Sequence, residues 1–357
     1  MRRPLSMLAA AAVAVAAAFI GGITASAASH SAITITSNSG FSTCACVTSG
    51  DGSAGNPFVI GPWAIAAPSG GSTGWAVKVD NSGGGVTSYF NITGISANYT
   101  DNVPNDPVIW LVKVTRSTTI SNVSANNDGT GMELDSSSNI TIDNMNFNKM
   151  TGHSAFFNGV TNVNMSNSKW KATEDGTVPH NADGLYMVNS SHVNIGGIAA
   201  CPHSGTCNTF DYDTGWAMYL QNDSYINVEH ASAQADDTGG FIIDGSNHVD
   251  LGFSSGSASG AICITLNGGK MPTGYFPSDL QGGLFLINGA SNNTIHDDGF
   301  SADTGIGIGN GGNGFYLNPC TNSSQPEPAE AGMGSGNVFT NDCYVSNTAG
   351  LPPNPCK

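Results

Sequence analysis

Acidic residues stand directly ahead of several short apolar runs in the middle of the chain. Asp183, Asp213 and the pair Asp236-Asp237 each precede a Gly or Thr-Gly that opens such a run. If these runs stack as rungs, neighbouring acids lie about 5 Å apart along the stack, and acids two rungs apart about 10 Å. Those separations bracket the paired carboxylates of glycoside hydrolysis, and stacked acids raise one another's pKa.

We therefore expect Asp183 and Asp213 to form an acid/base pair, with assistance from Asp211, Asp236 or Asp237. His180 is a candidate proton shuttle because imidazole titrates near neutral pH. Two alternatives stay open. Asp before Gly is a good turn residue, whose carboxylate caps backbone N–H groups. A stacked acidic column also offers the oxygen ligands that Ca²⁺ prefers, although the hydrolytic reading requires no cofactor.

Aromatic residues cluster in sequence around these acids and are candidates for stacking on sugar rings. The expected substrate contacts are Trp170, Lys171, Tyr186, Tyr212 and Trp216. Trp170 and Tyr212 fall in two inserted stretches, 169–181 and 199–212, so we expect them on loops that wall a groove. Tyr186 and Trp216 fall in strand-like runs, where an aromatic side chain points into the core as often as outward.

A repeated pattern must position these residues. A polar residue followed by apolar, polar and apolar residues recurs five times, as Asn139–Ile142, Asn162–Met165, His192–Ile195, Tyr225–Val228 and His248–Leu251. A second short apolar run precedes each copy, and the shortest repeat is about 20–23 residues, which is too short for a helix and two strands. The pattern predicts an all-β, right-handed parallel β-helix of roughly nine or ten coils. A β-sandwich is the alternative.

Four segments follow from this reading. Residues 1–28 have a basic start, an apolar run and Ala25-Ser26-Ala27, which predict a signal peptide and a secreted, extracellular protein. Residues 29–75 are expected to form an N-terminal cap and first coil, because an open solenoid end exposes strand edges. We expect the parallel β-helix over 76–317 and a C-terminal loop and tail over 318–357. The apolar run is too short for a confident membrane span, and we expect a monomer.

The charge of the chain limits the classes of partner that it can bind, and its cysteine content suggests disulfides. The chain has 26 acidic and 10 basic residues and a formal net charge of −16, which argues against binding nucleic acid or an anionic membrane. The eight cysteines suggest disulfides in an exported protein, with connectivity left open. Cys44-Ala45-Cys46 is either structural or a soft-metal site.

Two resemblances add to these inferences. The stretch Ser49–Ile60, with Gly50-Asp51-Gly52 and Asn56-Pro57-Phe58, is similar to the entry segment of NosD-like β-helix proteins. The stretch His180–Leu185 resembles the Asn-Thr-Asp-Gly segment of polygalacturonase-type hydrolases, with Ala182 in place of the usual Thr. The second resemblance implies that Asp183 and an acid one coil later are catalytic.

This chain departs from the polygalacturonase pattern in three ways. Asp211 and Asp213 are split by Tyr212, whereas the family has adjacent acids. The family's Gly-His-Gly and Arg-x-Lys motifs are missing, and the second of these grips uronate carboxylates. The departures favour a neutral or weakly charged polysaccharide as the partner.

The resulting hypothesis is a secreted, carbohydrate-active glycoside hydrolase. The alternative is a non-catalytic, NosD-like surface or glycan-binding protein. A polysaccharide lyase is less favoured, because it needs a basic catalytic residue and Arg116 is the only arginine after the leader. Acids that open into one groove favour the hydrolase, whereas acids that cap backbone N–H groups favour the alternative.

Overall fold

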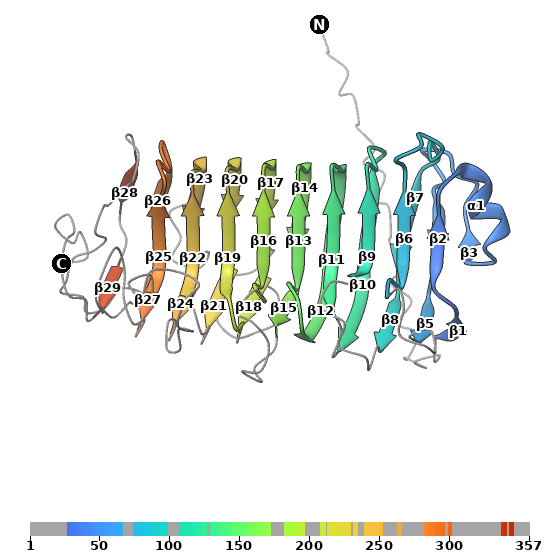
Figure 1. Ribbon diagram of the computed structural model, residues 1–357, viewed down its shortest axis with the longest axis horizontal. Coiled ribbons are helices and arrows are strands. Elements are labelled where there is room, and N and C mark those ends of the chain that lie inside the picture. The colour runs from blue at the N-terminus through green and yellow to red at the C-terminus, as the bar shows by residue number, and fades with distance from the viewer. Residues whose placement is uncertain are drawn as a thin grey trace, which may run out of the picture.

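The structure is a computed structural model. It describes residues 27–66, 74–98, 107–126, 129–172, 182–196, 208–211, 213–229, 231–234, 239–252, 263–265, 282–296, 299–301, 337–340 and 343–345. Short strands stack coil upon coil in chain order, from α1 (Asn38–Thr43) at one end to β29 (Cys343–Val345) at the other (Figure 1). The expected all-β, right-handed parallel β-helix is confirmed.

One side of the solenoid is a nine-stranded sheet, to which each successive coil contributes one strand. Its strands are β2 (Ile33–Ile35), β6 (Val77–Asp80), β9 (Pro107–Val112), β11 (Thr130–Asp135), β13 (Ala155–Asn158), β16 (Leu185–Val188), β19 (Trp216–Gln221), β22 (Gly239–Asp244) and β25 (Gly282–Ile287). All of them pair in parallel and in register.

The rest of the solenoid is a twenty-stranded sheet that bends, so that most coils contribute two successive runs. The first run holds β4 (Phe58–Ile60), β7 (Phe90–Thr93), β10 (Thr118–Asn126), β12 (Ser138–Met150), β14 (Thr161–Ser166), β17 (Ser191–Ile195), β20 (Ser224–Val228), β23 (Asn247–Gly252), β26 (Thr294–His296) and β28 (Val338–Thr340). The second holds β1 (Ala28–His30), β5 (Trp63–Ala66), β8 (Ile95–Asn98), β15 (Lys169–Ala172), β18 (Asn208–Asp211), β21 (Ala231–Gln234), β24 (Cys263–Thr265), β27 (Gly299–Ser301) and β29. β10 and β12 are long enough to pass through both runs.

The repeated sequence pattern is the first run of this sheet. Its apolar positions stack one above another inside the solenoid, as Ile142, Met165 and Ile195 do at 0–1% exposure. Each such side chain contributes about 1.5–3 kcal/mol by leaving water. The polar residue that opens each copy has a left-handed backbone, with φ of 62° at Asn139 and 55° at Asn162. Asn and His tolerate that conformation better than most residues, and they open four of the five copies, Tyr225 being the exception.

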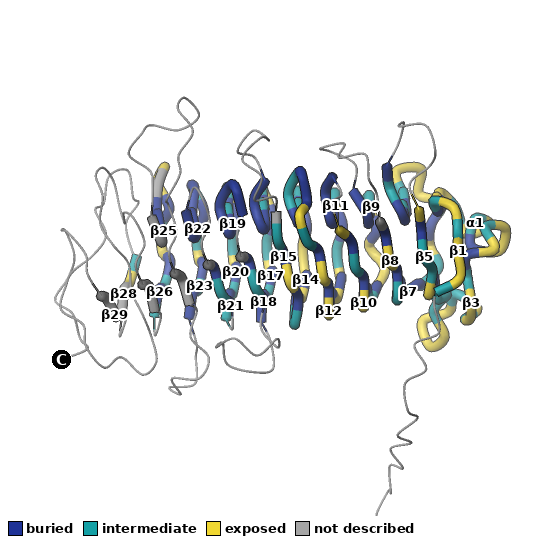
Figure 2. Tube along the Cα trace, turned by 90° about the horizontal axis from the view of Figure 1, so that it is seen from below, coloured by how far each residue is buried: buried dark blue, intermediate teal, exposed yellow. Residues whose placement is uncertain are grey.

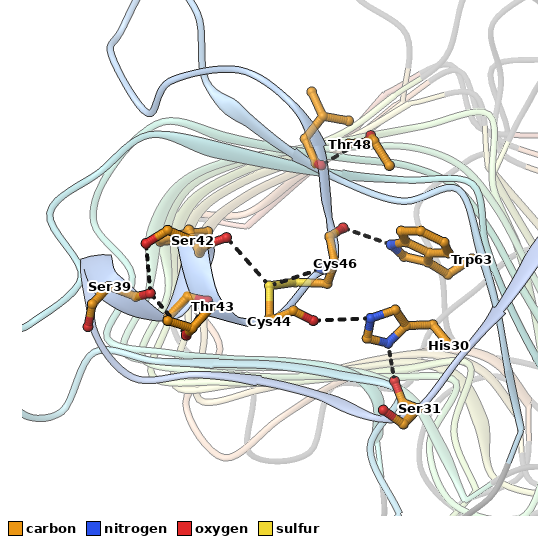
Figure 3. The surroundings of a disulfide bond; sticks show 12 residues. His30, Ser31, Ser39, Ser42, Thr43, Cys44, Cys46, Thr48 and Trp63 are labelled. Atoms are coloured by element: carbon orange, nitrogen blue, oxygen red, sulfur yellow. Dashed lines mark hydrogen bonds between the residues drawn. A yellow bond between two sulfur atoms is a disulfide. The ribbon is translucent and has the colours of Figure 1, made fainter.

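The N-terminal end is covered by α1 and by β3 (Val47–Ser49), which pairs antiparallel with β4. Cys44 and Cys46 form a disulfide beside this helix, which is the structural role expected for that pair (Figure 3). The indole N–H of Trp63 donates to the Cys46 carbonyl at 2.7 Å, and the His30 ring lies between the carbonyl oxygens of Ser31 and Cys44. These contacts join the cap to the first coils.

The described part of the stretch 169–181, residues 169–172, is a strand and not the predicted loop. This strand is β15, in which Lys169 and Trp170 pair with β12 through Asn146 and Phe147. Likewise the stretch 199–212 includes β18, whose Thr209 and Phe210 pair with β15. Residues 1–26 of the predicted leader lie outside the described residues, whereas Ala28, its last residue, opens β1 and pairs with Trp63. In the part of the chain that the structure describes, no helix is long and apolar enough to cross a membrane.

Candidate functional site: the outer face of the nine-stranded sheet

Two rows of side chains run along the outer face of the nine-stranded sheet, because alternate strand positions point away from the core. We call their polar and aromatic members the outer strip: Lys78, Trp110, Glu133, Phe156, Tyr186 and Tyr219 in the first row, and Asp80, Asp135, Asn158, Gln221 and Asp244 in the second. Most of these residues are half-buried, whereas exposed positions alternate along β12 and β14 (Figure 2).

Aromatic rings form a ladder in the middle of the outer strip. The ring centroids of Phe156 and Tyr186 are 5.4 Å apart, and those of Tyr186 and Tyr219 are 5.1 Å apart. The His153 ring lies 5.2 Å from Tyr186. Successive coils place these rings at nearly constant spacing because the strands stay in register. The result is a partly exposed aromatic surface on rigid strands.

Carboxylates lie at the N-terminal end of the ladder. Asp135 accepts a hydrogen bond from the indole N–H of Trp110 at 2.9 Å and from the amide of Asn158 at 3.3 Å. Glu133, two residues earlier on the same face, is hydrogen-bonded to Asp135. Burial first, and then the charge and hydrogen bond of Asp135, raise the pKa of Glu133 to about 8, against the opposing effect of Lys78. Glu133 therefore holds a proton at neutral pH.

A second polar network lies at the other end of the ladder. Asp244 accepts hydrogen bonds from the Tyr219 hydroxyl at 2.7 Å, from Gln221 at 3.2 Å and from Asn288 at 2.7 Å. The Tyr186 hydroxyl donates to Gln221 at 2.7 Å. Burial and nearby carboxylates raise the pKa of both tyrosines, so their hydroxyls remain donors. The network holds the tyrosine rings in one orientation.

The predicted acid pair does not open onto this face. Asp183 is 5% exposed and Asp213 is 1% exposed. Oδ1 of Asp183 accepts a hydrogen bond from the backbone N–H of Trp216 at 2.6 Å, and Oδ2 lies 3.2 Å from Nδ1 of His153. A Cβ at Gly215 would clash with the Asp183 carboxylate, and one at Gly184 would clash with that of Asp213. The two acids are thus packed against glycine backbone, and Asp183 caps the first backbone N–H of β19 in the next coil.

The predicted aromatic contacts divide between core and face. Trp170 was expected on a loop, but it is fully buried in β15, between Phe147 and Phe210. The alternation of β15 decides this, since Trp170 shares the inward register position with those two residues. Trp216 is also buried and packs against Phe285. Among the predicted aromatic contacts that the structure describes, only Tyr186 lies in the outer strip as expected.

The structure describes only two of the remaining predicted site residues, Lys171 and Asp211. Lys171 is half-buried at the end of β15, on the other sheet. Asp211 belongs to β18, where its backbone pairs with Gln234 of β21. The remaining predicted residues, His180, Tyr212, Asp236 and Asp237, lie outside the described residues. Among described residues, no group of three or more His, Cys, Asp or Glu side chains is arranged to hold a metal ion.

Sequence reasoning missed Glu133, Asp135, Gln221 and Asp244. The sequence signal for these residues was the alternation within the first apolar run of each repeat. Polar residues at every second position of such a run share the outer face of the sheet. Met132 and Leu134 are buried, so Glu133 and Asp135 must point outward. Which outward residues of different repeats lie in one row depends on the register between the paired strands, and only the assembled coils show that register.

Comparisons with known proteins show no family for the chain. No protein-family model and no curated protein matches the chain, so the NosD-like and polygalacturonase-like resemblances stay predictions. Among solved structures, the chain is similar to the enzymatically active domain of bacteriophage CBA120 tailspike protein 2, with 12% identity over 79% of this chain and 43% of that one and a TM-score of 0.47.

Two further solved structures align at lower scores. ORF18 of Geobacillus virus E2 aligns with 14% identity over 85% of this chain and 55% of that one, with a TM-score of 0.33. The catalytic domain of a GH87 α-1,3-glucanase aligns with 10% identity over 78% and 55%, with a TM-score of 0.23. The chain therefore spans about half the length of the tailspike and ORF18 chains that it matches. Its own stacked parallel sheets make it a parallel β-helix protein.

Proposed function

We propose that the protein is a secreted glycan-binding β-helix whose binding surface is the outer strip. The observation that carries the proposal is the half-buried ladder of Phe156, Tyr186 and Tyr219, held between two hydrogen-bonded carboxylate networks. Rings of this kind offer large, rigid contact surfaces at a low cost in conformational entropy. Carboxylate and amide oxygens beside them accept hydrogen bonds from sugar hydroxyls.

The charge of the outer strip favours a neutral polysaccharide. Asp135 and Asp244 border the ladder, whereas the one basic residue of the strip, Lys78, is paired with Asp80 at 3.4 Å and lies over the Trp110 ring. A uronate or sulfated glycan would meet carboxylates of its own sign, in a chain of net charge −16. Neutral sugar rings meet no such repulsion.

Binding to a panel of neutral polysaccharides, measured by affinity electrophoresis and calorimetry, tests the proposal. We expect Tyr186→Ala to weaken binding about tenfold, which corresponds to about 1.4 kcal/mol. The control is Tyr225→Ala, because Tyr225 is 53% exposed and stacks between His192 and His248 at the start of β20, on the other sheet. Absence of binding to any neutral glycan, or equal losses in both variants, would sink the proposal.

Glycoside hydrolysis is a second candidate function, and the protonated Glu133 favours it. Glu133 would donate its proton to the glycosidic oxygen as that bond breaks, while water adds to the anomeric carbon and loses a proton to a carboxylate. Asp135 is in hydrogen-bond contact with Glu133, which is closer than the roughly 5–5.5 Å of a retaining pair. Asp80 lies two coils from Asp135 in the second row, and we assign it as the base of an inverting reaction.

Reducing-sugar release separates the two candidates. Glu133→Gln keeps the shape of the side chain but removes its titration, so hydrolysis should fall at least a hundredfold while glycan binding persists. Asp183→Asn, at the buried turn, should leave release unchanged. If the wild type binds a glycan and releases no sugar from it, the protein is a binding protein and hydrolysis is excluded for that glycan.

A further inference from the structure

A polar groove lies on the twenty-stranded sheet, away from the outer strip. It has a volume of about 460 Å³ and crosses β8, β10 and β12. Its polar lining consists of hydroxyl and amide side chains alone, from Ser96, Ser124, Asn126, Asn146 and Asn148. Such side chains both donate and accept hydrogen bonds, which is the chemistry needed to bind sugar hydroxyls.

The groove is built from stacked coils and is therefore regular. Ser96, Ser124 and Asn146 occupy one column, and the Asn148 amide donates to Asn126 at 2.7 Å in the next. Three coils extend about 10 Å along the solenoid axis. The inward residues beneath the first two coils are Ala97 and Ala125, whereas the following coil carries Phe147. The lining is thus a repeating ladder on rigid strands.

Lysines gather at one end of this groove. A register shift in β12 lies between Phe147 and Met150, which pair with Trp170 and Ala172, so one extra residue enters the strand. Lys149 sits in this bulge, exposed and with φ of 56°. Bulges re-aim side chains, and they occur frequently beside functional sites.

Two more lysines come from the neighbouring strand. Lys169 is exposed and pairs in register with Asn146 of the groove wall, so it lies one coil from that wall. Lys171 follows on the same strand. One coil beyond, Thr209 of β18 pairs with Lys169. Three of the ten basic residues of an acidic chain therefore lie beside one polar groove.

We infer that this groove and its three lysines form a second glycan site, specific for anionic sugars. The serine and asparagine side chains bind sugar hydroxyls, and Lys149, Lys169 and Lys171 meet carboxylate or sulfate groups. Charge complementarity separates this site from the acidic outer strip, so the two faces of the solenoid select opposite classes of polysaccharide. The inference does not depend on the function proposed for the outer strip.

Binding to dextran sulfate and polygalacturonate, with unmodified dextran as the neutral probe, tests this inference. We expect binding to the anionic probes, weakened as NaCl rises from about 0.01 M to about 1 M because salt screens the lysines. Dextran sulfate and polygalacturonate report sulfate and carboxylate recognition separately. Dextran bound by the outer strip should be insensitive to salt. Binding to neither anionic probe, or anionic binding that does not weaken as NaCl rises, would overturn the inference.

Variants locate the binding. The double variant Lys149→Asn/Lys169→Gln should weaken anionic-glycan binding at least tenfold. Its matched control is Lys113→Asn, since Lys113 is also exposed with a left-handed φ of 51° but lies between β9 and β10. Asn146→Trp fills the groove without changing charge and should weaken binding as well. If Lys113→Asn costs as much as the double variant, or Asn146→Trp costs nothing, the attraction is diffuse and the site is wrong.

Discussion

The carboxylate of Asp183 accepts a hydrogen bond from the backbone N–H of Trp216, 2.6 Å away and one coil further along the solenoid. The aspartate ahead of Gly184 thus connects two coils. It is 5% exposed, and a carboxylate so deeply buried needs hydrogen-bond donors from the protein. The same relationship explains why Gly215 is glycine, since a Cβ there would clash with the carboxylate. The acid closest to the polygalacturonase-type pattern stabilises the fold.

Asp183→Ala should destabilise the protein by about 1–3 kcal/mol, because the Trp216 N–H loses its acceptor in a buried place. Asp183→Asn keeps an amide oxygen in that position and should cost clearly less. Urea unfolding of the two variants measures the difference. Equal costs for Ala and Asn would show that the charge, and not the hydrogen bond, is what matters.

Asp223 should make the protein less stable at alkaline pH. It is fully buried, its Oδ1 accepts the Ser190 N–H at 2.6 Å, and its Oδ2 has no hydrogen-bond partner among the described residues. Burial raises its pKa from 3.8 to about 8, against the opposing hydrogen bonds, so the folded state holds a proton that the unfolded state has released. The stabilising contribution is complete below about pH 4 and is lost as the pH rises towards 8.

Asp223→Asn removes this titration while keeping the acceptor for Ser190, and Asn293 shows that Asn suits a buried position in a similar turn. Between about pH 5 and about pH 9 the wild type should lose a few kcal/mol of unfolding free energy relative to the variant. Urea unfolding at both pH values measures the loss. Parallel pH profiles for the two proteins would contradict the prediction.

Trp170 should matter for stability and not for glycan binding. It is fully buried between Phe147 and Phe210, so Trp170→Ala should cost about 3–5 kcal/mol, whereas Trp170→Phe keeps most of the packing. The Phe variant should bind every glycan as the wild type does. Lost glycan binding in a Phe variant of unchanged stability would return Trp170 to the binding surface.

Gly50 and Gly84 separate steric crowding from backbone preference. Both have a left-handed φ, 91° and 68°, but a Cβ at Gly50 would clash with the Pro57 carbonyl, whereas Gly84 has open space around it. Gly84→Ala should cost about 1 kcal/mol, the conformational penalty alone, and Gly50→Ala should cost several times more. Thermal unfolding of the pair compares them, and similar melting temperatures would contradict the proposed clash.

The solenoid was predictable because its signal is local and repeated. Alternation buries Ile142, Met165 and Ile195 on one side of each strand, and a polar residue with a left-handed backbone, such as Asn139 or Asn162, marks each entry. Steric and hydrophobic rules act on these few residues whatever lies elsewhere in the chain. Because the same pattern recurs in every repeat, signals that are weak in one repeat together predict the fold.

The sites were less predictable because they depend on which coil faces which. Sequence proximity grouped Trp170 with the acids, but β15 turns it into the core. Glu133 and Tyr186 lie far apart in the chain, yet register places them in one row. By itself, the sequence determined the repeat, the strands and the turn residues through short-range physics. Only the tertiary structure decided which side chains meet. Once two strands are paired, their register fixes the distance between two side chains, whatever the number of residues in the loop that joins the strands.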